Sequence, residues 1–135
     1  TKDGLWRERS TRRLLEIQAR MDVAVFGLGS PFAEVPSQVY IGGYLDAEDY
    51  RSLSADGVVG DIATVFYRGD GTFDAIELNA RASGPNLDRL RRVARRICVV
   101  SGVQKLPSLR GALAAGLITD LILDESLAAA LARDI

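Results

Sequence analysis

The chain has 135 residues, of which 47% are hydrophobic and 26% charged, and this composition is typical of one globular domain with a single core. The formal net charge is −1, which excludes both the bulk positive charge of a nucleic-acid-binding protein and an acidic tail. No apolar run reaches the length of about 18 residues that a membrane span requires, so we expect no membrane partner.

Two residue counts limit the chemistry that the chain can perform. Histidine is absent, which removes the commonest general base and the commonest transition-metal ligand. Cys98 is the single cysteine, so it can form neither an internal disulfide nor a metal-binding cysteine cluster, and we expect it to be a small buried hydrophobic residue. We therefore expect no metal and no cofactor, in a protein suited to the reducing cytoplasm.

Capping residues and apolar patterns predict helices that alternate with short strands. In chain order, we expect a helix at 11–20 capped by Ser10, a buried strand near 22–28, a helix at 47–55 capped by Asp46, two strands within 58–84, a helix at 86–94 capped by Asn86, a buried strand near 96–101, a helix at 106–116, a strand near 120–123 and a helix at 125–135 capped by Asp124.

This order predicts an α/β fold with a mostly parallel, Rossmann-like sheet and helices on both of its faces. The two strands near 61–79 interrupt the alternation and are expected to form an inserted β-hairpin. Its turn is predicted at Gly69–Gly71, because an Asp-Gly pair favours the positive φ angles of a tight turn. No repeat, low-complexity tract or linker divides the chain.

Ligands of open α/β sheets bind beyond the carboxyl ends of the strands, so the segments after the buried strands are the first candidates. The segment Gly27-Leu28-Gly29-Ser30 follows the first strand. It does not complete a dinucleotide fingerprint, because Phe32 stands where a third glycine is needed and Pro31 interrupts the turn. A tight backbone turn is the favoured interpretation.

The segment after the second buried strand contains Gly102 and Lys105 and leads into the helix that begins near Pro107. Gly102 allows a close approach of the backbone, and the start of the helix directs free N–H groups back toward the loop. Lys105 adds a positive charge where the helix dipole already favours an anion. The arrangement suits a phosphate, sulfate or carboxylate, although a solvated surface lysine remains an alternative.

Asp61 allows two interpretations. It is either a solvent-facing carboxylate at the start of a strand, or an acceptor of hydrogen bonds from paired ligand hydroxyls. The arginine-rich segment 89–96 also allows two, a DNA-binding helix or a solvated helix face. The second is favoured, because no aromatic or amide side chain that reads bases is interleaved with the arginines.

Several segments together resemble a known family. They are "DVAVFGLGS", "GYLDAEDYRSL", "GVVGDI", "YRGDGTF" and "LDRLRRVARRICVVSGVQKLPSLRGALAAGLITDLILDESLAAAL". From about residue 10 to the end, the chain resembles the C-terminal half of the sugar-binding domain of SorC/DeoR-type bacterial transcription regulators. The resemblance implies the fold of the glucosamine-phosphate deaminase and ribose-phosphate isomerase group. It also implies that residues 1–135 are part of one effector-binding domain, with the first half of that domain and the helix-turn-helix outside this chain.

The resemblance also implies partners and residue roles. The effector would be a phosphorylated sugar, the helix-turn-helix outside this chain would bind operator DNA, and the regulator would be a homo-oligomer. Lys105 and Gly102 would hold the phosphate, Asp61 would hold sugar hydroxyls, and Gly29 and Ser30 would form the adjoining wall. The expected function is to sense the effector and thereby control DNA binding in carbohydrate metabolism, without enzymatic activity.

Two alternative functions remain open at this point. One is a sugar-phosphate isomerase or deaminase of the same fold group, for which Asp61 is the only good candidate for a general base. The other is an oligomerisation module that binds no ligand.

Overall fold

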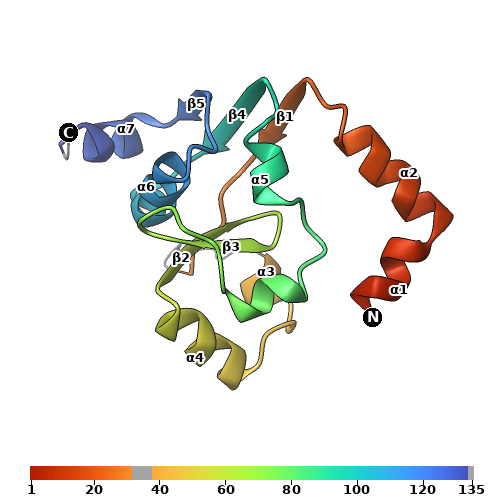
Figure 1. Ribbon diagram of the computed structural model, residues 1–135. Coiled ribbons are helices and arrows are strands. Elements are labelled where there is room, and N and C mark those ends of the chain that lie inside the picture. Colours follow the sequence, from red (N-terminus) through yellow and green to blue (C-terminus); the bar gives the residue numbers. More distant parts are fainter. Residues whose placement is uncertain (32–37, 134–135) are drawn as a thin grey trace.

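The computed structural model describes residues 1–31 and 38–133, which form a parallel sheet, a β-hairpin and the helices around them (Figure 1). The strands are β1 (Val23–Phe26), β2 (Val58–Ile62), β3 (Val65–Arg68), β4 (Arg95–Val100) and β5 (Asp120–Leu123). The helices are α1 (Lys2–Arg7), α2 (Arg9–Gln18), α3 (Gln38–Ile41), α4 (Ala47–Ala55), α5 (Leu87–Leu90), α6 (Leu106–Ala114) and α7 (Glu125–Ala132), with short 3₁₀ turns η1 (Glu77–Ala80) and η2 (Val103–Lys105).

The main sheet has the strand order β1-β4-β5, and both of its strand pairs are parallel. Val25 lies opposite Ile97 in the first pair, and Cys98 lies opposite Leu121 in the second. The prediction of an α/β fold with a mostly parallel sheet and an added hairpin is confirmed. The strands predicted near 22–28, 96–101 and 120–123 correspond to β1, β4 and β5. The expectation that the first of them is buried is wrong, because Val23 is 49% exposed and Val25 is 67% exposed.

The two faces of this sheet differ in what covers them. Phe26, Cys98 and Val100 point toward the main hydrophobic core, where residues of α5, α6 and α7 pack against them. On the other face Val25 is 67% exposed and Ile122 is 57% exposed. Among the described residues, helices therefore cover one face of the sheet. The expected cover on the second face is not provided by this part of the chain, although parallel sheets are as a rule buried on both faces.

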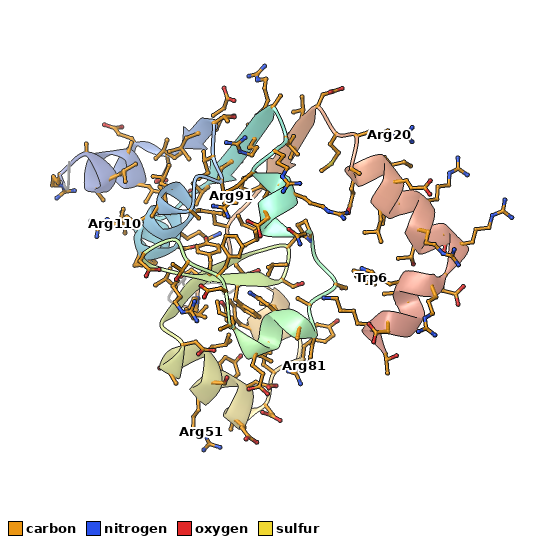
Figure 2. All side chains as sticks on the ribbon, viewed as in Figure 1. Trp6, Arg20, Arg51, Arg81, Arg91 and Arg110 are labelled. Carbon is orange, nitrogen blue, oxygen red and sulfur yellow. The ribbon has the colours of Figure 1, made fainter. Side chains whose placement is uncertain are left out.

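Helices α1 and α2 form an arm beside the rest of the molecule, and neither helix has a buried residue (Figure 1). Trp6 lies on the side of α1 that faces the body of the protein (Figure 2). A cavity of about 540 Å³ separates the arm from the segment that contains α5, and it is lined by Trp6, Leu15 and Leu87 among others.

The hairpin is present, but the predicted position of its turn is wrong. The turn is made by Ala63 and Thr64, whose φ angles are 46° and 72°, and not by Gly69–Gly71. Two-residue hairpin turns need positive φ at both central residues, and Asp61 compensates for the missing glycine because its Oδ2 accepts a hydrogen bond from the Thr64 N–H (3.2 Å).

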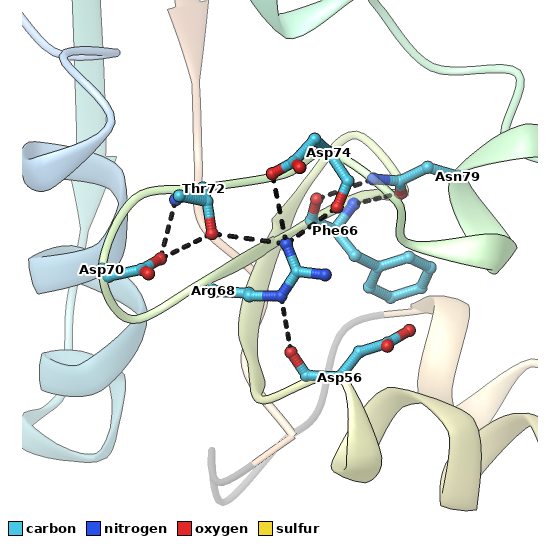
Figure 3. A network of polar contacts seen from close by, with 7 residues as sticks. All are labelled: Asp56, Phe66, Arg68, Asp70, Thr72, Asp74 and Asn79. Carbon is cyan, nitrogen blue, oxygen red and sulfur yellow. Dashed lines mark hydrogen bonds and ion pairs between the residues drawn. The ribbon is translucent and has the colours of Figure 1, made fainter.

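The Gly69–Gly71 segment makes a separate turn just after β3. The Arg68 N–H donates to the Thr72 carbonyl (2.9 Å), and the Thr72 N–H donates to the Asp70 carboxylate (2.9 Å). The Arg68 side chain then connects this turn to its surroundings, because its Nε donates to the Asp56 carbonyl (2.7 Å) and it forms an ion pair with Asp74 (3.6 Å) (Figure 3).

Two of the predicted helix starts have a clear local cause, and the predicted cap of a third is wrong. Asp46 and Asp49 form a capping box at α4, with distances of 2.8 and 3.1 Å. Asn86 caps α5, which is a single turn and shorter than predicted because the chain enters β4 at Arg95. Helix α2 begins at Arg9, so the predicted cap Ser10 lies inside the helix.

Candidate functional site

The segment after β1 is the centre of the candidate site. Gly29 forms an antiparallel bridge with Asp61 of β2, in which the Gly29 N–H donates to the Asp61 carbonyl (2.9 Å) and the Asp61 N–H donates to the Gly29 carbonyl (3.2 Å). Leu28 and Ser30 are both buried. The carboxyl end of β1 is therefore attached to the hairpin, and the structure brings Gly29, Ser30 and Asp61 together.

Lys105, in the loop after β4, also contacts the segment after β1. Its Nζ donates a hydrogen bond to the Leu28 carbonyl at 2.8 Å, and its side chain is half-buried. The freely solvated lysine is therefore excluded. None of the ion pairs among the described residues includes Lys105, so the hydrogen bond to a neutral carbonyl leaves its charge without a counter-ion there. A cation thus lies between the carboxyl ends of the neighbouring strands β1 and β4.

Gly102 has a positive φ angle of +99°, a conformation that favours glycine. Its N–H donates to the Asp124 carboxylate at 3.1 Å. Asp124 precedes α7 as predicted, but its side chain does not cap that helix. The amide predicted to hold a phosphate oxygen therefore already binds a carboxylate oxygen, and a phosphate at this position would have to displace Asp124.

Sequence reasoning missed a buried hydroxyl pair beside the site. The Ser108 hydroxyl donates to the Gly29 carbonyl (2.7 Å), and the Tyr67 hydroxyl lies 2.6 Å from Ser108 Oγ and donates to the Ser108 carbonyl (3.0 Å). Burial raises the pKa of Tyr67, against the opposing effect of its hydrogen bond with Ser108, so its hydroxyl stays protonated. The available signal was a serine in the first turn of a mostly apolar helix.

The close approach of α6 to β2 explains the glycine in "GVVGDI". A Cβ atom at Gly60 would lie 2.0 Å from Ser108 Oγ and 2.8 Å from the Gly29 carbonyl oxygen. No side chain fits in that space, so Gly60 allows the contact between Ser108 and the segment after β1.

The side chain of Asp61 is buried, since the residue is 4% exposed, so the interpretation as a solvent-facing carboxylate is excluded. Asp61 is the cross-strand partner of Phe66, so the two side chains lie on the same face of the hairpin. Tyr40 packs its ring against Phe66 on that face. Burial, and after it the charge of Asp61, raises the pKa of Tyr40, which keeps its hydroxyl neutral.

The structure groups four of the five predicted residues and separates the fifth. The segment after β1 contains Gly29 and Ser30, and both Asp61 and Lys105 contact this segment. The Gly102 N–H is instead directed to Asp124. None of the five lines the cavity of about 540 Å³ beside α1 and α2. The candidate site is thus a cluster of hydrogen-bonded groups at the carboxyl edge of the sheet, and it shares none of these residues with the lining of that cavity.

Other groups are committed to the fold. Burial raises the pKa of the Cys98 thiol to about 11, so the cysteine is an unreactive core residue. In the arginine-rich segment, Arg95 pairs with Asp120 (3.2 Å), and Arg96 donates to backbone carbonyls that include that of Val93 (2.6 Å).

In the parts of the chain that the structure describes, no group of three His, Cys, Asp or Glu residues could hold a metal ion. No helix within these parts has the length and apolarity needed to cross a bilayer.

The comparison with protein families gives a match over nearly the whole chain. Residues 1–133 match the family model described as "Putative sugar-binding domain". The chain belongs to this sugar-binding domain family.

Individual relatives agree with this assignment. The chain is 30% identical over 129 residues to the deoxyribonucleoside regulator of Bacillus subtilis (strain 168), covering 96% of this chain and 40% of that protein. Among solved structures, it matches a domain of a possible sugar-binding transcriptional regulator from Arthrobacter aurescens TC1, with 56% identity and a TM-score of 0.87 over 96% of this chain and 49% of that one. It also matches a DeoR family transcriptional regulator from Listeria monocytogenes, with 30% identity and a TM-score of 0.87 over 96% of this chain and 52% of that one. The chain therefore spans about half or less of the length of these relatives, from 40% to 52%.

Proposed function

We propose that the chain is part of the effector-sensing domain of a bacterial transcription regulator of carbohydrate metabolism, and that the effector is a phosphorylated sugar. The observation that supports this most strongly is the position of Lys105. Its ammonium group lies at the carboxyl edge of the sheet, between β1 and β4, and no ion pair among the described residues neutralises it. This is the edge where ligands of open α/β sheets bind.

The phosphate would bind at Lys105 and the loop of Gly102, where a cation and the start of α6 favour an anion. The hydrogen bond from the Gly102 N–H to the Asp124 carboxylate (3.1 Å) supports this part of the proposal, because it shows that this N–H can bind an anionic oxygen. The sugar hydroxyls would bind at Asp61, and the Gly29–Ser30 segment would form the wall between the two ends.

The same contacts offer a route from the effector to the rest of the regulator. Lys105 bonds to the segment after β1, and Gly102 bonds to the residue that precedes α7. A phosphate that competes for these donors would shift both neighbours, and such a shift would alter oligomerisation or operator binding through a helix-turn-helix outside this chain. The proposed regulator is a homo-oligomer in the cytoplasm.

We also propose that the domain is not an enzyme. The chain has no histidine, and the best candidate for a general base, Asp61, is buried and accepts a hydrogen bond from the Thr64 N–H. A relative that matches 96% of this chain is named a regulator, which favours a ligand-binding role for Asp61 over a catalytic one.

The exposed face of the parallel sheet fits a chain that is part of a larger domain. We propose that the remainder of the domain covers Val25 and Ile122, because parallel sheets are normally buried on both faces and the related regulators are about twice as long. Cysteines placed at these two positions in the full-length regulator should react slowly with a thiol reagent, whereas they should react fast if the face is free.

The proposed function is tested by calorimetry on the full-length regulator that contains this chain. Ribose 5-phosphate, glucose 6-phosphate and fructose 6-phosphate are titrated beside the same sugars without phosphate and beside inorganic phosphate. We expect one sugar phosphate to bind much more tightly than either of its parts and to change operator binding in a mobility-shift assay. Tighter binding of an unphosphorylated sugar would contradict the proposal, and so would turnover of any sugar phosphate.

A further inference from the structure

A buried polar group near the candidate site has no visible role in the fold. Tyr40, in α3, is 8% exposed, and its hydroxyl has no hydrogen-bond partner among the described residues. Buried polar groups are nearly always hydrogen-bonded, and a phenolic hydroxyl can both donate and accept. The partner of this hydroxyl is therefore expected to lie outside the described residues.

The ring of Tyr40 is held in place by its neighbours. It makes an edge contact with Phe66, with ring centroids 6.2 Å apart, and stacks on Tyr50 at 6.4 Å. The Tyr50 hydroxyl in turn donates to the Tyr40 carbonyl. These contacts fix the ring in a single orientation, so the hydroxyl cannot readily turn out to solvent to find a partner.

The nearest candidate for a shared ligand is the one that would also contact Asp61. Asp61 and Phe66 are paired across the hairpin, so the carboxylate and the Tyr40 ring lie on the same hairpin face. Burial first, and then the charge of Asp61, raises the pKa of Tyr40, so the hydroxyl is a neutral donor beside an acceptor. A carboxylate and a phenol side by side complement a ligand hydroxyl, which both donates and accepts.

We propose that Tyr40 is a ligand-binding residue, and that its hydroxyl and the Asp61 carboxylate together bind one hydroxyl group of the sugar effector. This inference rests on the proposed function and adds a specificity-determining residue to it. The negative charge of Asp61 repels an anion, so the phosphate lies away from Tyr40, toward Lys105. The two ends of the site thus select different parts of one molecule.

Such an arrangement discriminates strongly between sugars. A ligand that lacks the hydroxyl leaves the buried phenol unpaired, and sites of this kind reject deoxy analogues. The sugar specificity of the domain therefore depends on Tyr40 at least as much as on the phosphate-binding loop.

The test uses the full-length regulator with Tyr40→Phe, and Tyr44→Phe as the matched control, because Tyr44 is 75% exposed. Two pairs of probes are titrated by calorimetry: ribose 5-phosphate with 2-deoxyribose 5-phosphate, and glucose 6-phosphate with 2-deoxyglucose 6-phosphate. We expect Tyr40→Phe to weaken binding of the best probe by about tenfold. The effect of Asp61→Asn should be smaller in the Tyr40→Phe background than in the wild type, because both residues bind one group.

The melting temperature without added sugar provides a second readout. Tyr40→Phe removes a buried unpaired hydroxyl, so we expect it to leave the melting temperature unchanged or to raise it. A lower melting temperature would overturn the inference, because it would show that the hydroxyl has a structural partner, such as a trapped water. Equal affinity of wild type and Tyr40→Phe for the best probe would overturn it as well and leave the proposed function intact. Failure of the wild type to bind any of the sugar phosphates would instead contradict the proposed function, and the inference with it.

Discussion

A buried tyrosine lies on each side of the β2–β3 hairpin, and the two have opposite hydrogen-bonding situations. Tyr67 faces α6, is 0% exposed, and bonds to both the hydroxyl and the carbonyl of Ser108. Tyr40 packs against the other face, is 8% exposed, and its hydroxyl has no partner among the described residues. The Tyr67 hydroxyl has its partners on one face of the hairpin, and this contrast is the reason for proposing that the Tyr40 hydroxyl, on the other face, binds a ligand.

The two faces of the hairpin also differ in what their polar groups are expected to do, which is to stabilise the fold on one face and to bind a ligand on the other. On the α6 side, the Gly29 carbonyl, the Ser108 hydroxyl and the Tyr67 hydroxyl form a connected chain of bonds. We expect substitutions there to change stability. On the Tyr40 side, the aromatic contacts are complete but the Tyr40 hydroxyl has no partner among the described residues, and we expect its removal to change ligand binding.

The largest effect is expected on the α6 side, at Gly60. A Cβ atom there would lie 2.0 Å from Ser108 Oγ and 2.8 Å from the Gly29 carbonyl oxygen, so Gly60→Ala should lower the free energy of unfolding by about 3 kcal/mol. Urea denaturation monitored by circular dichroism measures this. Gly69→Ala is the matched control, because its Cβ would meet only Val59 Cγ1 at 3.5 Å, and it should stay within about 0.5 kcal/mol of the wild type. Equal stability of the two variants would show that α6 can move away from the hairpin at little cost.

The second effect tests whether the α6 side also takes part in binding. Lys105→Ala should weaken binding of a sugar phosphate by about ten- to a hundredfold, because a charged hydrogen bond to the phosphate is lost. It should also lower stability by about 1 kcal/mol, because the bond to the Leu28 carbonyl disappears. Operator binding without sugar should be retained.

Calorimetry and thermal melts separate these two consequences at Lys105. Lys2→Ala is the matched control, since Lys2 is the other lysine of the chain and lies over the Trp6 ring in α1 (5.4 Å to the centroid). If Lys105→Ala lost stability and kept its affinity, Lys105 would belong entirely to the structural network around Ser108.

The third effect compares the two tyrosines directly. Tyr67→Phe should lower the free energy of unfolding by about 1–2 kcal/mol, because it leaves buried Ser108 groups without their partner. Tyr40→Phe should cost nothing, because its hydroxyl has no partner among the described residues. Urea denaturation of both variants under identical conditions measures the contrast. Equal losses would remove the difference on which the Tyr40 inference depends.

Elements with a local cause could be predicted from the sequence, and those that depend on distant contacts could not. The positions of the parallel strands and the caps Asp46 and Asn86 follow from apolar runs and from side chains that bond within one helical turn. The hairpin turn was misplaced, because the favourable Asp-Gly pair lies elsewhere and Ala63 and Thr64 are unusual residues for positive φ.

For the candidate site, the residues at strand ends were predictable, but their partners were not. The contact of Lys105 with the Leu28 carbonyl joins residues 77 positions apart, and that of Ser108 with Gly29 joins residues 79 apart. No local pattern records such distances. Tyr40 could not be singled out either, since a tyrosine near a glycine pair is unremarkable until its buried hydroxyl is seen without a partner.

The smallest effect concerns the contact between Gly102 and Asp124, which a phosphate could replace. The Asp124 carboxylate accepts the Gly102 N–H at 3.1 Å, at the position proposed for a phosphate oxygen. Asp124→Asn keeps an oxygen that can accept this hydrogen bond and removes the negative charge, so repulsion of the phosphate falls while the loop keeps its shape. Affinity for a sugar phosphate should rise by about two- to fivefold, and the gain should shrink as salt is added. Affinity for the same sugar without phosphate should not change. Glu125→Gln makes the same change of charge on the neighbouring exposed residue and is the matched control. Calorimetry at two salt concentrations measures the effect. Weaker phosphate binding by Asp124→Asn would mean that the carboxylate positions the Gly102 loop for the ligand and does not compete with it, and Asp124 would then belong with Tyr67 and Ser108 among the groups that complete the fold.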